Sequence, residues 1–318
     1  SAASDVYKRQ GMYWSNISVD QADLIVGVGM RFDDRVTGKV DTFAPHARIV
    51  HMDIDPSQIG RNVPVEIPIV GDAKALLKNL APMVTNVPRP DWMQYIENLK
   101  RDHPSLSIPA SDVLQPQQVI SAMDALVQEN PDTTIVTGVG QHQMWAAQFL
   151  SFNHENTFVS SGGLGAMGFE LPAALGVQVA KPEAPVWVVA GDGGFQMTLQ
   201  ELVTLTEEGL PVKIALINNG HLGMVKQWQE MYYDGHLKAV PVDGPDFIKL
   251  AEAYGVNATR VSEYEDVLPA LRQAQAHDGP FLVEFVVDSS TNVYPMVPPG
   301  GSLADTIEDP APARNALD

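Results

Sequence analysis

The chain has 318 residues, of which 45% are hydrophobic and 19% are charged, a composition typical of folded domains rather than disordered segments. Acidic residues number 39 against 20 basic ones, which gives a formal charge of −19, and the absence of a basic patch argues against nucleic-acid binding. There is no cysteine, so disulfides and thiolate chemistry are excluded, and no apolar run approaches the roughly 18 residues of a membrane span. We therefore expect a two-domain cytoplasmic protein without membrane contacts, or an organellar one if a transit peptide preceded the chain.

The first part of the chain predicts an incomplete α/β domain. Residues 1 to about 15 fit no element well, and the opening letters SAASDVYKRQ suggest a scar of sequence assembly or cloning. Three short apolar strands and a helix are expected at 22–29, 47–55, 67–70 and 73–83. An acidic residue at a strand end, such as Asp53, is where dinucleotide-binding folds hold ribose hydroxyls, although Asp53 and Asp55 could equally begin the turn before Pro56.

The rest of the chain predicts a linker and a second α/β domain. Proline-rich residues 86–115 indicate a linker with one helix, roughly 92–102, and strand and helix patterns alternate from 116 onward. Helices are expected at 117–128, 169–180, 246–254 and 266–277, with strands at 134–137 and 281–287. We therefore assign an α/β fold with two doubly wound parallel-sheet domains, divided into an unmatched start (1–15), a partial central domain (16–85), the linker (86–115), a second domain (116–290) and a tail (291–318).

The second domain is organised around residues 186–228. The apolar run 186–190 predicts a strand buried on both faces, and the glycine-rich turn Gly-Asp-Gly-Gly follows it. Apolar residues at helical spacing over 196–208 predict a helix that ends at Gly209, and 212–217 predicts a second strand. This strand–helix–strand order requires two parallel strands joined by a right-handed connection.

The polar residues that follow these two strands point to a metal-bridged diphosphate. Asp192 and Asn219 stand 27 positions apart, each at the carboxyl end of a predicted parallel strand, where ligands of open α/β sheets bind. A carboxylate, an amide oxygen and nearby backbone carbonyls suit Mg²⁺, which keeps coordination sites for phosphate oxygens or water. The glycines after Asp192 precede a helix start, which favours an anionic phosphate. A GDG turn by itself, however, is a common loop.

Seven motifs that follow one another along the chain indicate a protein family. They are RFDDRVTG, HMDIDP, GVGQHQMWAAQF, SSGGLGAMGF, GDGGF followed by QEL, NNGHLGMVKQW and YPMVPPGG. Together they resemble the catalytic subunits of acetolactate synthase, also called acetohydroxyacid synthase, a branch of the thiamin diphosphate-dependent enzymes. The resemblance covers roughly residues 21–301.

The resemblance implies three cofactors and their sites. The Mg²⁺ ligands would be Asp192, Asn219 and the backbone carbonyl of His221. Residues along thiamin diphosphate would be Gln141, His142, Gly165, Met167, Gly193, Gly194, Leu222, Gly223 and Met224, in addition to the metal ligands. Met167 is a candidate for bending the thiamin into its reactive shape. A structural FAD would contact Gly29, Arg31, Arg35, Asp53, Ile54, Asp72 and Ala73.

The resemblance also implies the reaction and its partners. Pyruvate would be decarboxylated and its two-carbon unit joined to a second pyruvate or to 2-ketobutyrate, the first common step of branched-chain amino-acid biosynthesis. The acceptor pocket would be formed by Arg35, Met224, Val225 and Trp228. The implied assembly is a homodimer or homotetramer with a regulatory small subunit. Alternatives are another thiamin- and flavin-containing enzyme, such as a pyruvate oxidase or glyoxylate carboligase, or a truncated cofactor-binding module without turnover.

Each of these assignments has a structural alternative. Met224 and Trp228 at helical spacing could belong to a core, His142 could be a satisfied polar residue, and Arg31 and Arg35 could pair with neighbouring aspartates on a solvated loop.

The sequence departs from the family pattern in four respects. Gly194 replaces a usual serine and so lacks a possible phosphate hydroxyl, Glu170 replaces a usual glycine, and the turn at 11–14 keeps only two of the four family residues. The family's activating glutamate belongs to an N-terminal domain that has no counterpart in this sequence. We therefore expect no catalytic residue within this chain and no activity from the chain alone.

Overall fold

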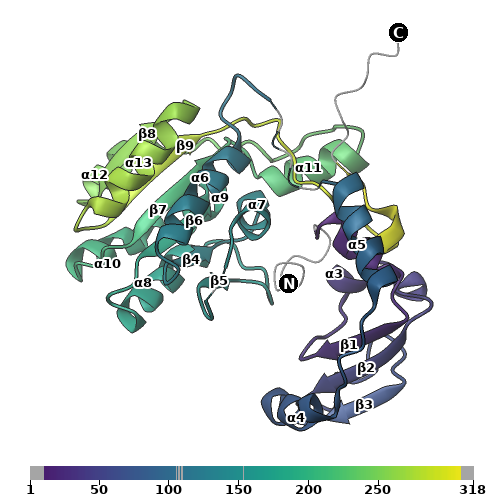
Figure 1. The fold of residues 1–318 in the computed structure, drawn as a ribbon. Coiled ribbons are helices and arrows are strands. Elements are labelled where there is room, and N and C mark those ends of the chain that lie inside the picture. The colour runs from purple at the N-terminus through teal and green to yellow at the C-terminus, as the bar shows by residue number, and fades with distance from the viewer. Residues whose placement is uncertain (1–10, 105, 107, 109, 153, 309–318) are drawn as a thin grey trace. The chain divides into compact units, whose positions relative to one another are not determined.

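The computed structural model describes residues 11–104, 106, 108, 110–152 and 154–308, and divides the chain into two compact units. The first unit holds residues 1–107 and 294–318, and the second holds 108–293 (Figure 1). Each unit is built on its own parallel sheet, with three strands in the first and six in the second. The expected opening scar, residues 1–10, lies outside the described residues. Within the described residues, no helix has both the length and the apolar character needed to cross a membrane.

The first unit contains a three-stranded parallel sheet in the order β1-β2-β3. Its strands are β1 (Leu24–Val28), β2 (Arg48–Asp53) and β3 (Ile67–Val70), close to the predicted positions. Its helices are α2 (Tyr13–Asp20), α3 (Asp34–Thr37), η1 (Val40–Thr42), α4 (Ala73–Leu80), η2 (Ala81–Met83), α5 (Pro90–Asp102) and η4 (Leu303–Asp305). Helix α2 begins at Tyr13, where the sequence analysis expected no element.

The core of the first unit joins segments from both ends of the chain. Phe32, Phe43 and Ile49 pack with Val297 and Leu303, which belong to the C-terminal segment. Two backbone hydrogen bonds between Met296 and Ile307, at 2.8 and 2.7 Å, join parts of that segment, and the Lys39 N–H donates to its Gly301 carbonyl at 2.8 Å. The predicted tail is therefore part of a packed core and not only a surface covering.

The second unit contains a six-stranded parallel sheet in the order β5-β4-β6-β7-β9-β8. Its strands are β4 (Thr134–Thr137), β5 (Phe158–Ser160), β6 (Val186–Gly191), β7 (Lys213–Asn218), β8 (Asn257–Val261) and β9 (Phe281–Val286). Its helices are α6 (Pro116–Glu129), α7 (Gln141–Phe149), α8 (Glu170–Ala180), α9 (Asp192–Phe195), η3 (Leu199–Glu201), α10 (Leu202–Glu207), α11 (Gly223–Tyr232), α12 (Phe247–Ala253) and α13 (Tyr264–Ala276).

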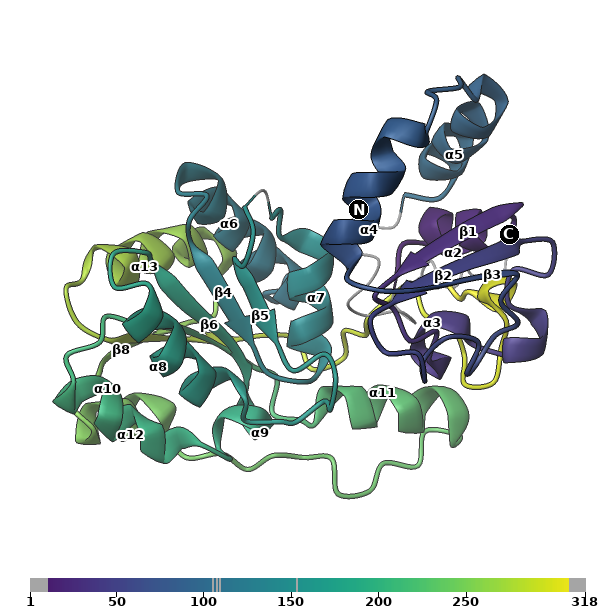
Figure 2. The same ribbon diagram turned by 90° about the horizontal axis from the view of Figure 1, so that it is seen from below.

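Helices cover both faces of this sheet, so the doubly wound α/β prediction is confirmed (Figure 2). Strand β6 shows why its apolar run does not alternate with polar residues. Trp187 and Val189 belong to the cluster beneath α6, α7 and α13, whereas Val186, Val188 and Ala190 belong to the cluster beneath α8, α10 and α12. Both faces of the strand are therefore buried, and the strand lies between two apolar layers.

The central connection differs from the single helix predicted over 196–208. Asp192 itself begins the short helix α9, which is followed by a turn, the 3₁₀ helix η3 and helix α10. Gly209 then adopts a φ of +62°, as expected of a glycine at a helix end. Strands β6 and β7 pair in parallel, with Gly191 opposite Ile217, so the predicted strand–helix–strand unit is present. Strands β5 and β8 and helix α11 were not predicted.

Candidate functional site

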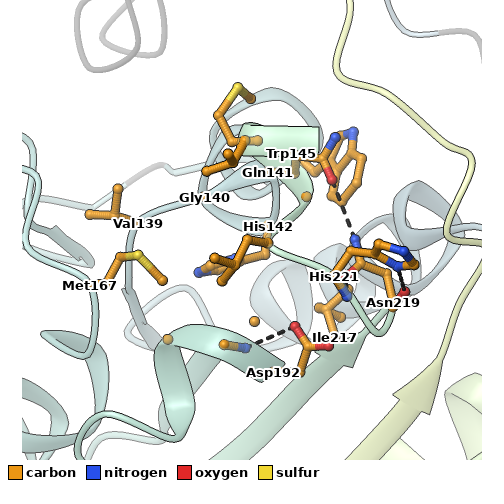
Figure 3. A pocket seen from close by; sticks show the side chains of 17 residues that line it. Val139, Gly140, Gln141, His142, Trp145, Met167, Asp192, Ile217, Asn219 and His221 are labelled. Carbon is orange, nitrogen blue, oxygen red and sulfur yellow. Dashed lines mark hydrogen bonds between the residues drawn. The ribbon is translucent and has the colours of Figure 1, made fainter. Parts of the chain in front are cut away.

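The carboxyl ends of β4, β6 and β7 surround one pocket in the second unit (Figure 3). Predicted residues that line it are Gln141, His142, Met167, Asp192, Gly193, Gly194, Asn219, His221, Leu222, Gly223, Met224 and Val225. The fold therefore gathers residues that lie as far apart in sequence as 141 and 225. A parallel sheet explains this, because its strands deliver their following loops to the same edge.

Asp192 presents an unpaired carboxylate oxygen at this edge. Its Oδ1 accepts a hydrogen bond from the Gly193 N–H at 2.8 Å, whereas its Oδ2 is buried and has no partner among the described residues. Burial raises the pKa of the Asp192 carboxyl to about 6, while the N–H groups of Gly193 and Gly220 oppose the shift. A bound cation would satisfy Oδ2 and favour the ionised form, so this carboxylate fits a metal ligand.

The loop after β7 fixes Asn219 and the His221 backbone. Asn219 Oδ1 accepts a hydrogen bond from the His221 N–H at 3.0 Å, and the neighbouring Leu222 N–H donates to the Val240 carbonyl at 2.8 Å. Gly220 supports the tight turn with a φ of +67°. No group of three or more His, Asp or Glu side chains that could hold a metal occurs in the described part of the chain. The predicted ligand set therefore depends on one carboxylate, one amide oxygen and one backbone carbonyl, together with oxygens from a bound diphosphate.

Two glycines of the pocket occupy positions where a Cβ would collide with neighbouring side chains. A Cβ placed on Gly193 would lie 2.5 Å from Leu222 Cδ2, and one on Gly223 would lie 2.0 Å from Gln141 Oε1. Both loops therefore require glycine at these positions, and neither glycine adds a side chain of its own to the pocket. This arrangement suits a diphosphate, which accepts several backbone hydrogen bonds at once.

Gln141 and His142, at the start of α7, also line the pocket. Burial lowers the pKa of His142 to about 4, so its imidazole is neutral at ordinary pH, and its buried Nε2 lacks a partner among the described residues. Gln141 donates a hydrogen bond to Gln227 Oε1 at 3.0 Å, and Gln227 is held by the Val293 backbone. His142 is therefore not the satisfied polar residue of the alternative interpretation, and Gln141 is fixed by a buried network.

Glu170, which replaces the glycine usual in the family, lies behind this pocket. Its side chain is fully buried at the start of α8, and neither carboxylate oxygen has a hydrogen-bond partner in the described residues. Burial raises the pKa of Glu170 to about 7, although the N–H groups of Gly168 and Glu170 lie close enough to oppose the shift. The extra acidic residue is therefore available as a neutral carboxylic acid near neutral pH.

Some predicted residues lie outside the pocket, and some pocket residues were not predicted. Gly165 lies in the loop before α8 with a φ of +70° and does not line the pocket. Trp228 stacks edge-on against Tyr232, with ring centroids 5.8 Å apart, and lines a separate hollow to which Val225 also contributes. Sequence reasoning missed Val139, Gly140, Trp145, Gly191 and Ile217. Trp145, four residues after Gln141, could have been found from helical spacing.

In the first unit, the predicted FAD residues gather at the carboxyl ends of β1, β2 and β3. Gly29 follows β1, Asp53 ends β2 and Ile54 follows it. Asp72 caps α4 by accepting a hydrogen bond from the Ala75 N–H at 2.9 Å, and Ala73 begins that helix. Asp53 Oδ1 accepts from the Asp55 N–H at 2.9 Å, so the turn-forming role considered for Asp53 is present in the structure. The FAD role of these residues stays a prediction.

The two predicted arginines of the first unit are exposed. Arg31 Nη2 lies 2.8 Å from Asp33 Oδ2, and Arg35 Nε lies 4.0 Å from Asp34 Oδ2. These are the solvated pairs of the alternative interpretation, and such pairs contribute only about 0–1 kcal/mol each. Both guanidinium groups therefore remain accessible to an anionic ligand at little cost.

Two family models match the chain. The thiamine pyrophosphate enzyme central domain matches residues 6–80, which begins earlier than the resemblance noted above. The thiamine pyrophosphate enzyme C-terminal TPP-binding domain matches residues 138–285, which includes every residue of the pocket.

Similar proteins with curated names are acetolactate synthases. The chain is 45% identical over 298 residues to the acetolactate synthase of Mycobacterium leprae, covering 90% of this chain and 47% of the relative. It is 46% identical to the acetolactate synthase large subunit of Corynebacterium glutamicum, covering 91% and 48% respectively. It is 40% identical to the acetolactate synthase isozyme 2 large subunit of Escherichia coli, covering 92% and 53%. The chain thus spans about half the length of the curated relatives it matches.

Proposed function

The chain belongs to the thiamine pyrophosphate enzymes, as a homologue of their acetolactate synthase large subunits, and from this premise we propose that it forms the metal–diphosphate part of an acetolactate synthase. The supporting observation is the unpaired, buried Oδ2 of Asp192, which lies at the carboxyl edge of a parallel sheet between two glycine loops. Such an oxygen is costly unless a cation binds it.

The proposed reaction joins two 2-ketoacids. When bound, thiamin diphosphate supplies the carbanion stabilisation that lets pyruvate lose CO₂ and pass its two-carbon unit to pyruvate or 2-ketobutyrate. This chain contributes binding and orientation. Asp192, Asn219 and the His221 carbonyl would hold Mg²⁺, while Gly193, Gly194, Leu222 and Gly223 would lie along the diphosphate. Gln141, His142, Gly165, Met167 and Met224 would surround the rest of the cofactor.

The remaining parts of the proposal concern the acceptor and FAD. Arg35 is a candidate for binding an acceptor carboxylate through its planar fork. Separately, Met224, Val225 and Trp228 are candidates for contacting the alkyl group of an acceptor. Packing against one additional methyl group discriminates acceptors by only about 1–3 kcal/mol. FAD would bind structurally along Gly29, Arg31, Arg35, Asp53, Ile54, Asp72 and Ala73. The assembly would be a homo-oligomer with a regulatory small subunit, since two of the relatives are named large subunits.

The test is calorimetric titration of thiamin diphosphate into the full chain with and without Mg²⁺. We expect binding that requires Mg²⁺ and that is lost in Asp192→Asn, which keeps the shape of the side chain but removes its charge. Asp266→Asn is the matched control, because it removes an exposed carboxylate from the first turn of α13. Binding of equal strength without metal, or in Asp192→Asn, would contradict the proposal.

A further inference from the structure

Gly194 and Glu170, the two residues of the second unit that depart from the family pattern, lie against each other in the fold. A Cβ placed on Gly194 would lie 3.0 Å from Glu170 Oε1, and one placed on Gly138 would lie 2.2 Å from Glu170 Oε2. The Glu170 carboxyl group therefore occupies the space beside two glycines that follow β4 and β6. Gly194 also lines the pocket, so the carboxyl group lies beside the point where a side chain at position 194 would begin.

Filling the space beside Gly138 and Gly194 does not by itself explain a carboxyl group there. An apolar side chain would fill it without cost, whereas two buried oxygens without partners each carry a desolvation penalty. Glu170 has this penalty on both oxygens, at 0% exposure. The arrangement therefore calls for a polar partner that arrives with the ligand of the pocket.

The surroundings of Glu170 favour its neutral form. Strands β4 and β6, which pack against α8, carry no titratable side chain, and Glu170 is the sole titratable residue of α8. Glu201 on η3, which also packs against α8, and Asp192 on α9 are both acidic. No basic side chain on these elements offsets a negative charge on Glu170, and burial raises its pKa to about 7.

We propose that Glu170 is a further cofactor-binding residue: a neutral carboxylic acid that donates its O–H to the bound diphosphate in place of a side chain at position 194. The inference rests on the proposed function, because it requires a diphosphate in the pocket. An ionised carboxylate would repel that diphosphate, so binding above neutral pH is coupled to uptake of a proton by Glu170.

The test is calorimetric titration of thiamin diphosphate with Mg²⁺ at pH 8, in buffers of different ionisation enthalpy. The wild-type chain is expected to take up about one more proton per bound cofactor than Glu170→Gln, whose amide can donate a hydrogen bond but cannot titrate. The affinity of wild type relative to Glu170→Gln should fall about tenfold for each pH unit above pH 8. Titrations of the cofactor and of Asp192 are common to both proteins and cancel in this comparison.

Glu201→Gln is the matched control, because Glu201 is the other acidic residue on the elements packed against α8, and its proton uptake should equal that of wild type. Equal proton uptake by wild type and Glu170→Gln would overturn the role of Glu170 while leaving the proposed function intact. Absence of binding in all three folded proteins would overturn the proposed function and this inference with it.

A measurement on wild type alone covers the case in which Glu170→Gln does not fold. Infrared difference spectra at pH 8, with and without isotope-labelled glutamate, should show a protonated glutamate carboxyl band on addition of thiamin diphosphate and Mg²⁺. A spectrum without that band would overturn the inference.

Discussion

The two ends of the six-stranded sheet differ in how their buried lysine and carboxylate side chains are paired. At the amino end, Lys213 Nζ donates to the carbonyls of His277 and Gly279, both at 2.6 Å, and Trp187 Nε1 donates to Gln275 Oε1 at 2.6 Å. At the carboxyl end, Asp192 Oδ2 and both oxygens of Glu170 are buried without partners among the described residues.

This difference indicates that the buried groups at the amino end serve stability and those at the carboxyl end serve ligand binding. A satisfied buried group contributes to the fold, whereas an unsatisfied one costs about 1–3 kcal/mol and persists where a ligand supplies the missing partner. Substitutions at the carboxyl end should therefore change cofactor binding more than folding, and those at the amino end should do the reverse.

Asp192→Asn should have the largest effect on binding. We expect the affinity for thiamin diphosphate with Mg²⁺ to fall by about 100-fold or more, since loss of outer-shell partners alone costs 10–100-fold. Thermal unfolding should occur at the same or a higher temperature, because the variant lacks a buried unpaired charge. A variant that unfolds at a clearly lower temperature would show that Asp192 stabilises the fold, and the comparison would fail.

Lys213→Met should give the opposite pattern. Burial lowers the pKa of Lys213 to about 8, and its removal leaves two carbonyls without a donor. We expect the free energy of unfolding in urea to fall by about 3 kcal/mol. The dissociation constant for thiamin diphosphate should stay within about twofold of wild type, since mutations at distant sites add independently. A large loss of affinity in the folded variant would contradict the separation.

The pH dependence of the free energy of unfolding should show the titration of Glu170. Its folded pKa of about 7 exceeds its reference value of 4.5, so the stability that it contributes is complete below pH 4.5 and is lost as the pH rises to about 7. The loss is about 3 kcal/mol.

His142 acts in the opposite direction, because its folded pKa of about 4 lies below its reference value of 6.5 and its contribution is lost as the pH falls. The two effects offset each other in wild type, so the measurement is the difference between wild type and Glu170→Gln in urea unfolding from pH 4.5 to 7. Parallel curves for the two proteins would show that Glu170 does not titrate in this range.

Gly223→Ala should have a smaller effect, again on binding. The new Cβ would displace Gln141, whose Oε1 also accepts a weak hydrogen bond from Asn219 Nδ2 at 3.4 Å. We expect about a tenfold loss of cofactor affinity and about 1 kcal/mol of stability. Gly176→Ala is the control, because it lies inside α8 with no atom within 4 Å of its Cβ and should be neutral or stabilising. Equal affinities of the two variants would contradict the role of the Gly223 loop.

Local sequence patterns were sufficient for all strands except β5 and β8, and for Asp192 and Asn219 in the pocket. The strands at 67–70 and 134–137 have the predicted bounds, because apolar runs between turn residues decide them. Asp192 and Asn219 meet because parallel strands deliver their loops to one edge. The motif resemblance predicted most of the other residues that line the pocket.

What could not be predicted depends on contacts distant in sequence. The break between α9 and α10 follows from Asp192 entering a helix at the end of β6, which the helical spacing of 196–208 does not show. The position of Glu170 between Gly138 and Gly194 required the fold, because none of the three residues is near another in sequence. The network that joins Gln141 to Gln227 was hidden for the same reason.

The central claim is that the carboxyl end of the sheet is incomplete without a metal-bound diphosphate. The most direct measurement is the paramagnetic resonance of free Mn²⁺, used in place of Mg²⁺, during titration with the full chain. We expect the wild-type chain to bind Mn²⁺ when thiamin diphosphate is present. The chain without thiamin diphosphate should bind no Mn²⁺. Asp192→Asn with thiamin diphosphate should bind no more Mn²⁺ than thiamin diphosphate does without protein. Equal Mn²⁺ binding by wild type and Asp192→Asn in the presence of thiamin diphosphate would contradict it.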